Sequence, residues 1–150
     1  MKKTKIALVQ MQMTSDIKKN LLNAKKKIKI AKSKGAKIVC LPELFASKYF
    51  CQSEKHSNFK LAEKIPGPIS TKFSLLAKEL KLIIILPIFE KRAAGIYHNT
   101  CLVIKENGKI AGKYRKMHIP DDPQYYEKFY FTPGDLGFKS VKTKFGKIGP

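Results

Sequence analysis

Three charged residues stand at positions where folded proteins often carry chemistry. Glu43 comes directly after a short apolar run, residues 36–41, that is typical of a buried strand. A carboxylate just past the carboxyl end of such a strand is where open α/β sheets commonly act on ligands. Lys116 ends a second strand-like run, and Glu127 follows it among five aromatic residues in the segment 125–131. Taken alone, Glu43 would more simply be an exposed loop glutamate.

The segment 113–135 holds two of these residues and predicts an active-site loop without helix. Pro120 and Pro123 interrupt its backbone, and Pro133-Gly134-Asp135 closes it with a turn signal. Long loops in compact domains are usually functional or disordered, and the aromatic residues argue against disorder. The alternative is a surface loop that its aromatic side chains anchor.

The cysteines and histidines offer weaker candidates. Three cysteines without CxxC spacing indicate neither a disulfide framework nor a zinc site, so we expect buried or unreactive thiols. We expect Asn99 and His118 to hydrogen-bond loops rather than to act in catalysis, and His56 and His98 to lie at the surface or at a strand end. The cysteines are Cys40, Cys51 and Cys101.

The order of elements predicts one layered α/β domain with a mixed sheet over residues 1–150. Oxygens of Thr14, Ser15 or Asp16 should cap a helix that Gly35 ends, and Ser70 should cap a second helix. Asn107-Gly108 predicts a hairpin between two strands. The expected strands are 5–11, 36–41, 82–89, 97–105, 109–115 and 138–143, with another beginning at 147.

The net charge of +20 raises the question of a nucleic-acid partner. The excess is almost all lysine, since Arg92 and Arg115 are the only arginines, and arginine is the usual residue for phosphate and base edges. We therefore expect no nucleic-acid role. No run approaches the ~20 apolar residues of a membrane span, and the basic start at residues 1–5 precedes no cleavage site, which predicts a cytoplasmic protein without a membrane partner.

Three blocks together resemble the nitrilase superfamily of carbon–nitrogen hydrolases, and within it the N-carbamoylputrescine amidase branch. They are LPELFASKYFCQ at 41–52, YRKMHIP at 114–120 and YYEKFYFTPGDLGF at 125–138. The resemblance runs in register from the first strand to Pro150. It implies a four-layer αββα sandwich, incomplete in this chain, with residues 1–150 as the N-terminal portion of a single hydrolase domain.

The resemblance also implies site roles. Glu43 matches the general base, Lys116 the lysine that stabilises the oxyanion, and Glu127 a second glutamate that positions lysine and substrate. A carboxylate in a water-poor pocket can activate a thiol, and two carboxylates should keep the lysine charged. The family's nucleophile is a cysteine after a Gly-Lys-Ile-Gly run; this chain stops at Pro150, before that position, and none of its cysteines matches it.

The expected activity is hydrolysis of a carbamoyl or amide C–N bond, most specifically of N-carbamoylputrescine to putrescine, CO₂ and ammonia in polyamine biosynthesis. The resemblance implies no cofactor or metal, a small carbamoyl-amine substrate and a homo-oligomer when complete. We expect the 150-residue chain alone to be inactive. Gln124 and Tyr126 depart from the family pattern, so two alternatives stay open: another amidase of the superfamily, such as one like β-ureidopropionase, or a non-catalytic binding module.

Overall fold

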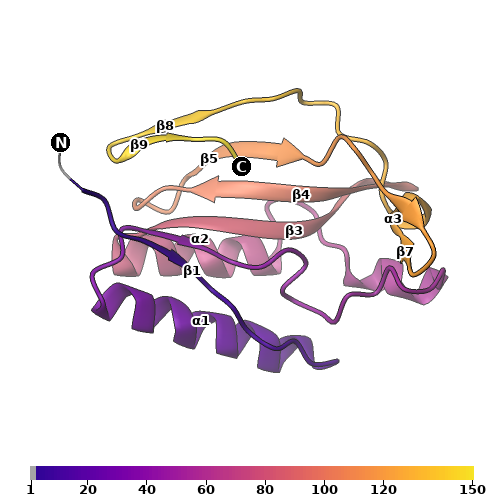
Figure 1. Ribbon diagram of the computed structural model, residues 1–150, viewed down its shortest axis with the longest axis horizontal. Helices are drawn as coiled ribbons and strands as arrows, with labels where there is room; N and C mark the ends of the chain where they lie inside the picture. Colours follow the sequence, from indigo (N-terminus) through magenta and orange to yellow (C-terminus); the bar gives the residue numbers. More distant parts are fainter. Residues whose placement is uncertain (1–2) are drawn as a thin grey trace.

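The computed structural model describes residues 3–150, which form a five-stranded sheet with helices on one face (Figure 1). The strand order is β1-β2-β3-β4-β5, with parallel pairing from β1 to β3 and antiparallel pairing from β3 to β5. The strands are β1 (Ile6–Leu8), β2 (Ile38–Cys40), β3 (Ile83–Ala93), β4 (Ile96–Ile104) and β5 (Ile110–Arg115).

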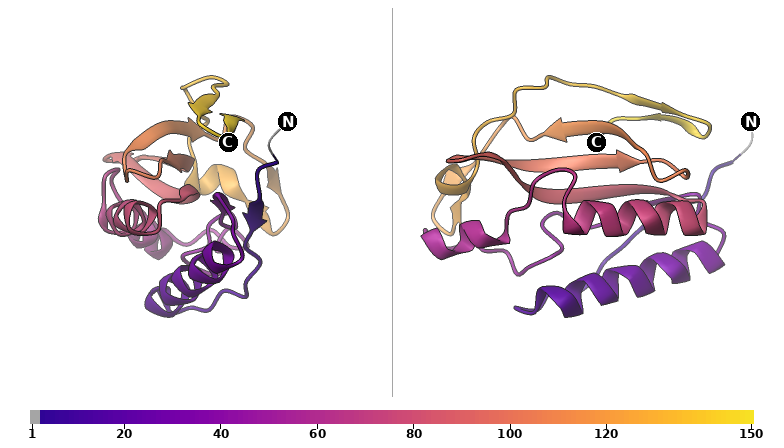
Figure 2. Two further views of the ribbon diagram at one scale, coloured as in Figure 1. Left: turned by 90° about the vertical axis from the view of Figure 1, so that its left-hand side faces the viewer. Right: turned by 180° about the vertical axis from the view of Figure 1, so that it is seen from behind.

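Two helices, α1 (Ile17–Ser33) and α2 (Pro68–Leu80), cover one face of the sheet (Figure 2). Asp16 caps α1, because its carboxylate accepts a hydrogen bond from the Lys19 N–H at 3.2 Å. Ala24 and Ile28 lie one helical turn apart and are fully buried, so the apolar stripe of α1 faces the sheet while its lysines face water.

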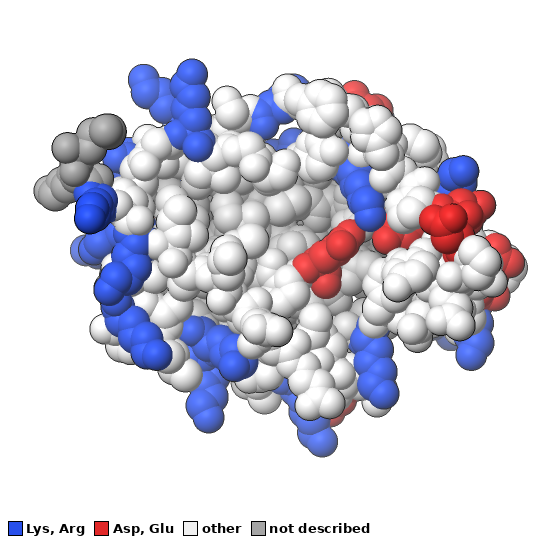
Figure 3. All heavy atoms as spheres, viewed as in Figure 1, with Lys and Arg blue, Asp and Glu red and all other residues white. Residues whose placement is uncertain are grey.

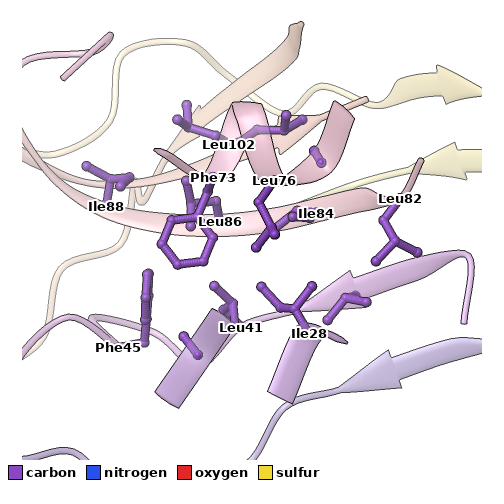
Figure 4. Packing of buried hydrophobic residues seen from close by; sticks show 14 of the residues in the cluster. Ile28, Leu41, Phe45, Phe73, Leu76, Leu82, Ile84, Leu86, Ile88 and Leu102 are labelled. Carbon is purple, nitrogen blue, oxygen red and sulfur yellow. The ribbon is translucent and has the colours of Figure 1, made fainter. Parts of the chain in front are cut away.

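The main core lies between these helices and the sheet (Figure 4). Alternate residues of β3, namely Ile84, Leu86 and Ile88, point toward the helices and meet Phe73 and Leu76 of α2. This packing fixes the position of β3 and, through it, the strands on either side that lead to the site.

The opposite face of the sheet is only partly covered. Ile38, Ile83, Ile85 and Val103 form a second cluster there, under the hairpin of β8 (Val141–Thr143) and β9 (Gly146–Ile148). Toward β1 this face is open, and the Leu8 side chain is 82% exposed. The described chain therefore contains one helix layer and one sheet of the four layers that the resemblance implies.

A third cluster is aromatic and lies at the end of the sheet where α3 is drawn in Figure 1. Phe50 stacks on Phe89 with ring centroids 5.1 Å apart, and Tyr130 meets Phe50 edge-on at 4.9 Å. This cluster joins the short elements η1 (His56–Leu61) and α3 (Glu127–Tyr130). The strands β6 (Asp121–Asp122) and β7 (Tyr125–Tyr126) pair with each other directly before α3.

The predicted mixed α/β sheet and the hairpin at Asn107-Gly108 are confirmed. The prediction of a helix-free segment 113–135 was wrong, because one turn of helix, α3, forms there. Ser70 is not the cap of α2: the helix begins at Pro68, and Glu63 accepts hydrogen bonds from Ile69 N and Ser70 N. The expected strands 5–11 and 138–143 are shorter, and 82–89 extends to Ala93.

Within residues 3–150 no helix is both long and apolar enough to cross a bilayer. Met1 and Lys2, at the basic start considered as a leader, lie outside the described residues.

Candidate active site

Glu43, Lys116 and Glu127 meet at the end of the sheet, although the chain separates them widely. The Lys116 ammonium donates to Glu127 Oε2 at 2.8 Å and lies 3.4 Å from Glu43 Oε1. The structure thus brings together all three residues that the sequence singled out, around one shared positive charge.

Glu43 is placed by the backbone that follows β2. Leu41 N donates to the Ile85 carbonyl, which continues the pairing with β3 up to the start of the turn. Leu44 then adopts a φ of +49° while its side chain is buried in the aromatic cluster. A non-glycine residue in this region costs about 1–3 kcal/mol, and such strain persists only where packing enforces it. The buried Leu44 side chain therefore fixes the direction of Glu43.

Lys116 is held by backbone contacts on both sides. Its N–H donates to the Asn99 carbonyl of β4 at 2.8 Å, and its carbonyl accepts from Gly134 N at 2.9 Å. A Cβ on Gly134 would lie 2.0 Å from the Arg115 carbonyl oxygen, so only glycine permits this close approach. The Pro133-Gly134-Asp135 turn is consequently part of the support for Lys116.

Glu127 begins α3 and is 3% exposed. A carboxylate is rarely buried to this degree unless it is paired. Its two oxygens are both occupied: Oε1 accepts from the Tyr49 hydroxyl at 3.0 Å and Oε2 from Lys116. Burial, and then the hydrogen bond to Glu127, raise the pKa of Tyr49, so this hydroxyl stays a donor. Hydrogen bonds to both of its oxygens thereby fix the Glu127 side chain beside the ammonium.

The electrostatics of Lys116 follow from these partners. Burial alone would lower its pKa, but the hydrogen bond to Glu127 and the negative charges of Glu43 and Glu127 outweigh burial and raise it. Lys116 is therefore an ammonium throughout the neutral range, as a group that stabilises an oxyanion must be.

Glu43 differs from the expected carboxylate in a water-poor pocket. Its side chain is 53% exposed, whereas that of Glu127 is 4% exposed. Figure 3 shows a face of the molecule on which several acidic side chains gather at one end and basic side chains line much of the rim. A half-exposed carboxylate beside a shielded one can exchange protons with a ligand that approaches from this open side.

The three cysteines are poor nucleophiles in this environment. Burial raises the pKa of Cys51 to about 12, with the nearby Glu127 charge adding to the effect, and burial raises that of Cys101 to about 12. Burial also raises the pKa of Cys40. At neutral pH all three are thiols, in accord with the expectation of unreactive cysteines.

Asn99 and His98, which are adjacent in β4, are more deeply buried than the sequence predicts. Asn99 is buried and its Nδ2 donates to Glu43 Oε1 at 2.5 Å, so it contacts the site directly. The expectation that His98 lies at the surface or at a strand end was wrong: it is 1% exposed, and its Nδ1 lies 2.9 Å from the Thr132 carbonyl. His118 is exposed. Nothing in the sequence around Asn99 indicates that its partner is Glu43.

A buried ion-pair network lies beside the site and has no counterpart in the sequence predictions. Arg115, which precedes Lys116, donates from Nε and Nη2 to the two oxygens of Glu90 at 2.8 and 2.7 Å, and from Nη1 to Asp135 at 2.7 Å. Glu90 also accepts from Thr100 and Lys113. This bidentate contact joins β3, β5 and the turn that supports Lys116.

In the part of the chain that the structure describes, no three histidine, cysteine, aspartate or glutamate side chains lie close enough together to bind a metal ion.

The chain is similar to known proteins along nearly its whole length. Residues 5–150 match the family model described as carbon-nitrogen hydrolase. An N-carbamoylputrescine amidase from Solanum lycopersicum is 42% identical over 145 residues, which are 96% of this chain and 48% of that protein. A citrullinase from Francisella tularensis is 39% identical over 146 residues, 97% of this chain and 51% of the citrullinase. The chain thus spans about half the length of the curated relatives it matches.

The fold of the chain also matches that of a solved structure. The crystal structure of a carbon-nitrogen hydrolase from Helicobacter pylori G27 matches with a TM-score of 0.90 at 44% identity, over 95% of this chain and 50% of that chain. The nitrilase-type arrangement of sheet and helices predicted from the three sequence blocks is confirmed.

Proposed function

The chain belongs to the carbon–nitrogen hydrolase family, and from this premise we propose that the whole protein hydrolyses the ureido C–N bond of N-carbamoylputrescine. The products are putrescine, CO₂ and ammonia, and the proposed setting is cytoplasmic polyamine biosynthesis by a homo-oligomer. Similarity to an N-carbamoylputrescine amidase over 96% of the chain supports the substrate class.

One observation carries the proposal: the Lys116 ammonium lies between the half-exposed Glu43 and the buried Glu127, at 3.4 and 2.8 Å. A base, a positive charge for an oxyanion and a group that orients that charge are what thiol-dependent hydrolysis of a carbamoyl group requires. The roles of the three residues are part of the proposal.

The proposed reaction has two steps. In the first, Glu43 takes the proton of a cysteine thiol, the sulfur attacks the carbamoyl carbon, and Lys116 stabilises the negative oxygen. The C–N bond to putrescine breaks, and the amine leaves with the proton that Glu43 carries. In the second step, water attacks the carbamoyl thioester while Glu43 takes its proton, which returns to the sulfur; carbamate leaves and decomposes to CO₂ and ammonia.

Cys40, Cys51 and Cys101 are poor candidates for the thiol of this reaction, because burial raises the pKa of each and so makes transfer of its proton to Glu43 more costly. We propose that the thiol belongs to a part of the whole protein outside these 150 residues. The isolated chain should therefore be inactive.

The charge near the site favours an amine over an acid as the far end of the substrate. The chain has a net charge of +20, but two exposed aspartates, Asp121 and Asp122, lie close to the site. They form β6, which pairs with β7, and β7 ends directly before Glu127. Figure 3 shows acidic atoms gathered at this end of the molecule. Negative charge here attracts the ammonium of N-carbamoylputrescine and repels the carboxylate of N-carbamoyl-β-alanine.

The test compares both substrates with the whole protein. We expect ammonia release from N-carbamoylputrescine at a higher kcat/KM than from N-carbamoyl-β-alanine, and loss of both activities in Glu43→Gln. Preference for the acidic substrate would overturn the assignment in favour of a different amidase. No turnover of any carbamoyl or amide substrate would favour the binding module, and binding of N-carbamoylputrescine without turnover would establish it.

A further inference from the structure

Asn99, in β4, contacts both Lys116 and Glu43. Its backbone carbonyl accepts the Lys116 N–H at 2.8 Å, and its side-chain Nδ2 donates to Glu43 Oε1 at 2.5 Å. The residue is 6% exposed, and β4 pairs with strands on both sides, so its Cα is fixed by the centre of the sheet. Glu43 and Lys116 reach this point from separate segments.

The two oxygens of Glu43 are consequently not equivalent. Oε1 receives Asn99 Nδ2 and the more distant Lys116 Nζ, whereas Oε2 accepts no hydrogen bond from any residue in the range 3–150. An oxygen with two donors is a weaker proton acceptor than a free oxygen on the same carboxylate. Any proton that Glu43 takes from a ligand therefore goes to Oε2.

The distances to Lys116 show a second effect of this contact. The ammonium lies 2.8 Å from Glu127 but 3.4 Å from Glu43, although Glu43 is the more exposed and less constrained of the two carboxylates. A neutral amide that holds Glu43 at its present distance prevents it from closing into a full ion pair. Such an ion pair would lower the basicity of Glu43 and occupy a donor of Lys116.

We propose that Asn99 is a positioning residue that directs Glu43 Oε2 toward the proton to be transferred and keeps Glu43 apart from Lys116. It acts through Glu43 and does not touch the substrate. This inference rests on the proposed function for its effect on turnover, but its effect on the distance between Glu43 and Lys116 is independent of any substrate.

Two variants separate this role from a purely structural one. Asn99→Ala removes the donor, so Glu43 can approach Lys116; kcat of the whole protein should fall about 10²-fold with little change in KM, the scale of loss for a misplaced group. Asn99→Asp keeps the shape but places a second carboxylate beside Glu43. The acidic limb of the kcat/KM profile should then move to higher pH by about one unit.

The same variants can be read without activity from crystal structures of the whole protein. The titratable groups around Glu43, which the variants leave in place, are Lys116, Glu127, Tyr49, Cys51 and Cys101. In Asn99→Ala we expect the distance between Glu43 and the Lys116 ammonium to shorten from 3.4 Å toward the 2.8 Å of the Glu127 contact, because nothing then holds Glu43 back. Asn107→Ala, which removes an amide at the far hairpin, is the matched control and should change neither this distance nor kcat.

An unchanged distance between Glu43 and Lys116 in Asn99→Ala, with a thermal unfolding midpoint like that of the parent protein, would overturn the inference. So would a rise in KM without a fall in kcat. If the whole protein turns over no carbamoyl substrate, the proposed function fails, while the distance between Glu43 and Lys116 in Asn99→Ala still decides the role of Asn99. If Asn99→Ala does not fold, the isosteric Asn99→Asp alone decides it.

Discussion

The hydrogen bond to the buried Glu127 and the charges of Glu43 and Glu127 raise the pKa of Lys116, and so they keep it charged against the effect of burial. Replacing Glu127 with Gln removes one of the two charges that raise the Lys116 pKa but leaves the burial that lowers it. The sign is therefore fixed: the Lys116 pKa should fall in Glu127→Gln. Titration of the lysine Nζ resonance by ¹⁵N NMR measures this directly in the chain.

Two controls accompany that measurement. Tyr49→Phe removes only the neutral hydrogen bond to Glu127 Oε1 and should lower the Lys116 pKa little or not at all. Glu54→Gln removes an exposed carboxylate with no hydrogen bond to Lys116 and should have no effect. A Lys116 pKa that stays constant in Glu127→Gln would contradict the assignment of Glu127 as the group that holds the ammonium.

Sequence patterns identify some of the residues at the site and miss others. Glu43, Lys116 and Glu127 could be found because three blocks at characteristic spacings match one family. Asn99 and Glu90 could not, because their importance lies in partners that only the pairing of β3, β4 and β5 brings within reach. Glu90 at the polar end of an apolar strand looks in the sequence like an exposed residue.

At the scale of elements, Glu90 makes the β3–β5 connection sensitive to acid. Burial alone would raise its pKa, but hydrogen bonds from Arg115, Thr100 and Lys113 outweigh burial and lower the pKa from 4.5 to about 2. A carboxyl whose pKa is lower in the folded state stabilises the fold above its unfolded pKa. That stabilisation, ~3 kcal/mol in the free energy of unfolding, is lost as the pH falls from 4.5 to about 2.

Glu90→Gln should remove this pH dependence and destabilise the chain at pH 7 by about 3–5 kcal/mol, because the buried Arg115 then keeps only the half-exposed Asp135 as a charge partner. Urea unfolding between pH 2 and 7 measures both effects. Asp135, whose pKa is also lowered to about 2 by Arg115, keeps a smaller dependence in the variant. Glu79→Gln is the control, since its 3.5 Å pair with Lys29 is exposed and should contribute almost nothing. Equal stability of Glu90→Gln and Glu79→Gln would contradict the network's role.

The element scale explains the errors in the predicted helices. The start of α2 was misplaced because its N-cap residue is Gly67, which has no capping side chain, and the N–H groups of Ile69 and Ser70 donate instead to the Glu63 carboxylate outside the helix. The single turn of α3 was missed because its stability comes from tertiary contacts: the Tyr130 hydroxyl bonds Ser53, Lys55 and Asn58. The longer α1 was predicted well because its cap and its apolar period are both local.

At the scale of the whole molecule, the uneven covering of the sheet predicts how the chain behaves in solution. The helices seal one face, but on the other face Ile6 is 58% and Leu8 82% exposed, both on the edge strand β1, and Phe138 is 78% exposed (Figures 1 and 2). An apolar sheet face next to an unpaired strand edge is a template for association. The high positive charge opposes contact between chains, so association should grow when salt screens it.

We therefore expect sedimentation velocity of the 150-residue chain to show self-association that increases with concentration and with salt. Leu8→Lys should weaken it, since it places a charge in the open face. Leu22→Lys is the matched control: Leu22 is 67% exposed on α1, on the helix side of the molecule, and its replacement should leave association unchanged. A chain that stays monomeric at all concentrations in high salt, or that responds equally to both substitutions, would show that the open sheet face does not drive association.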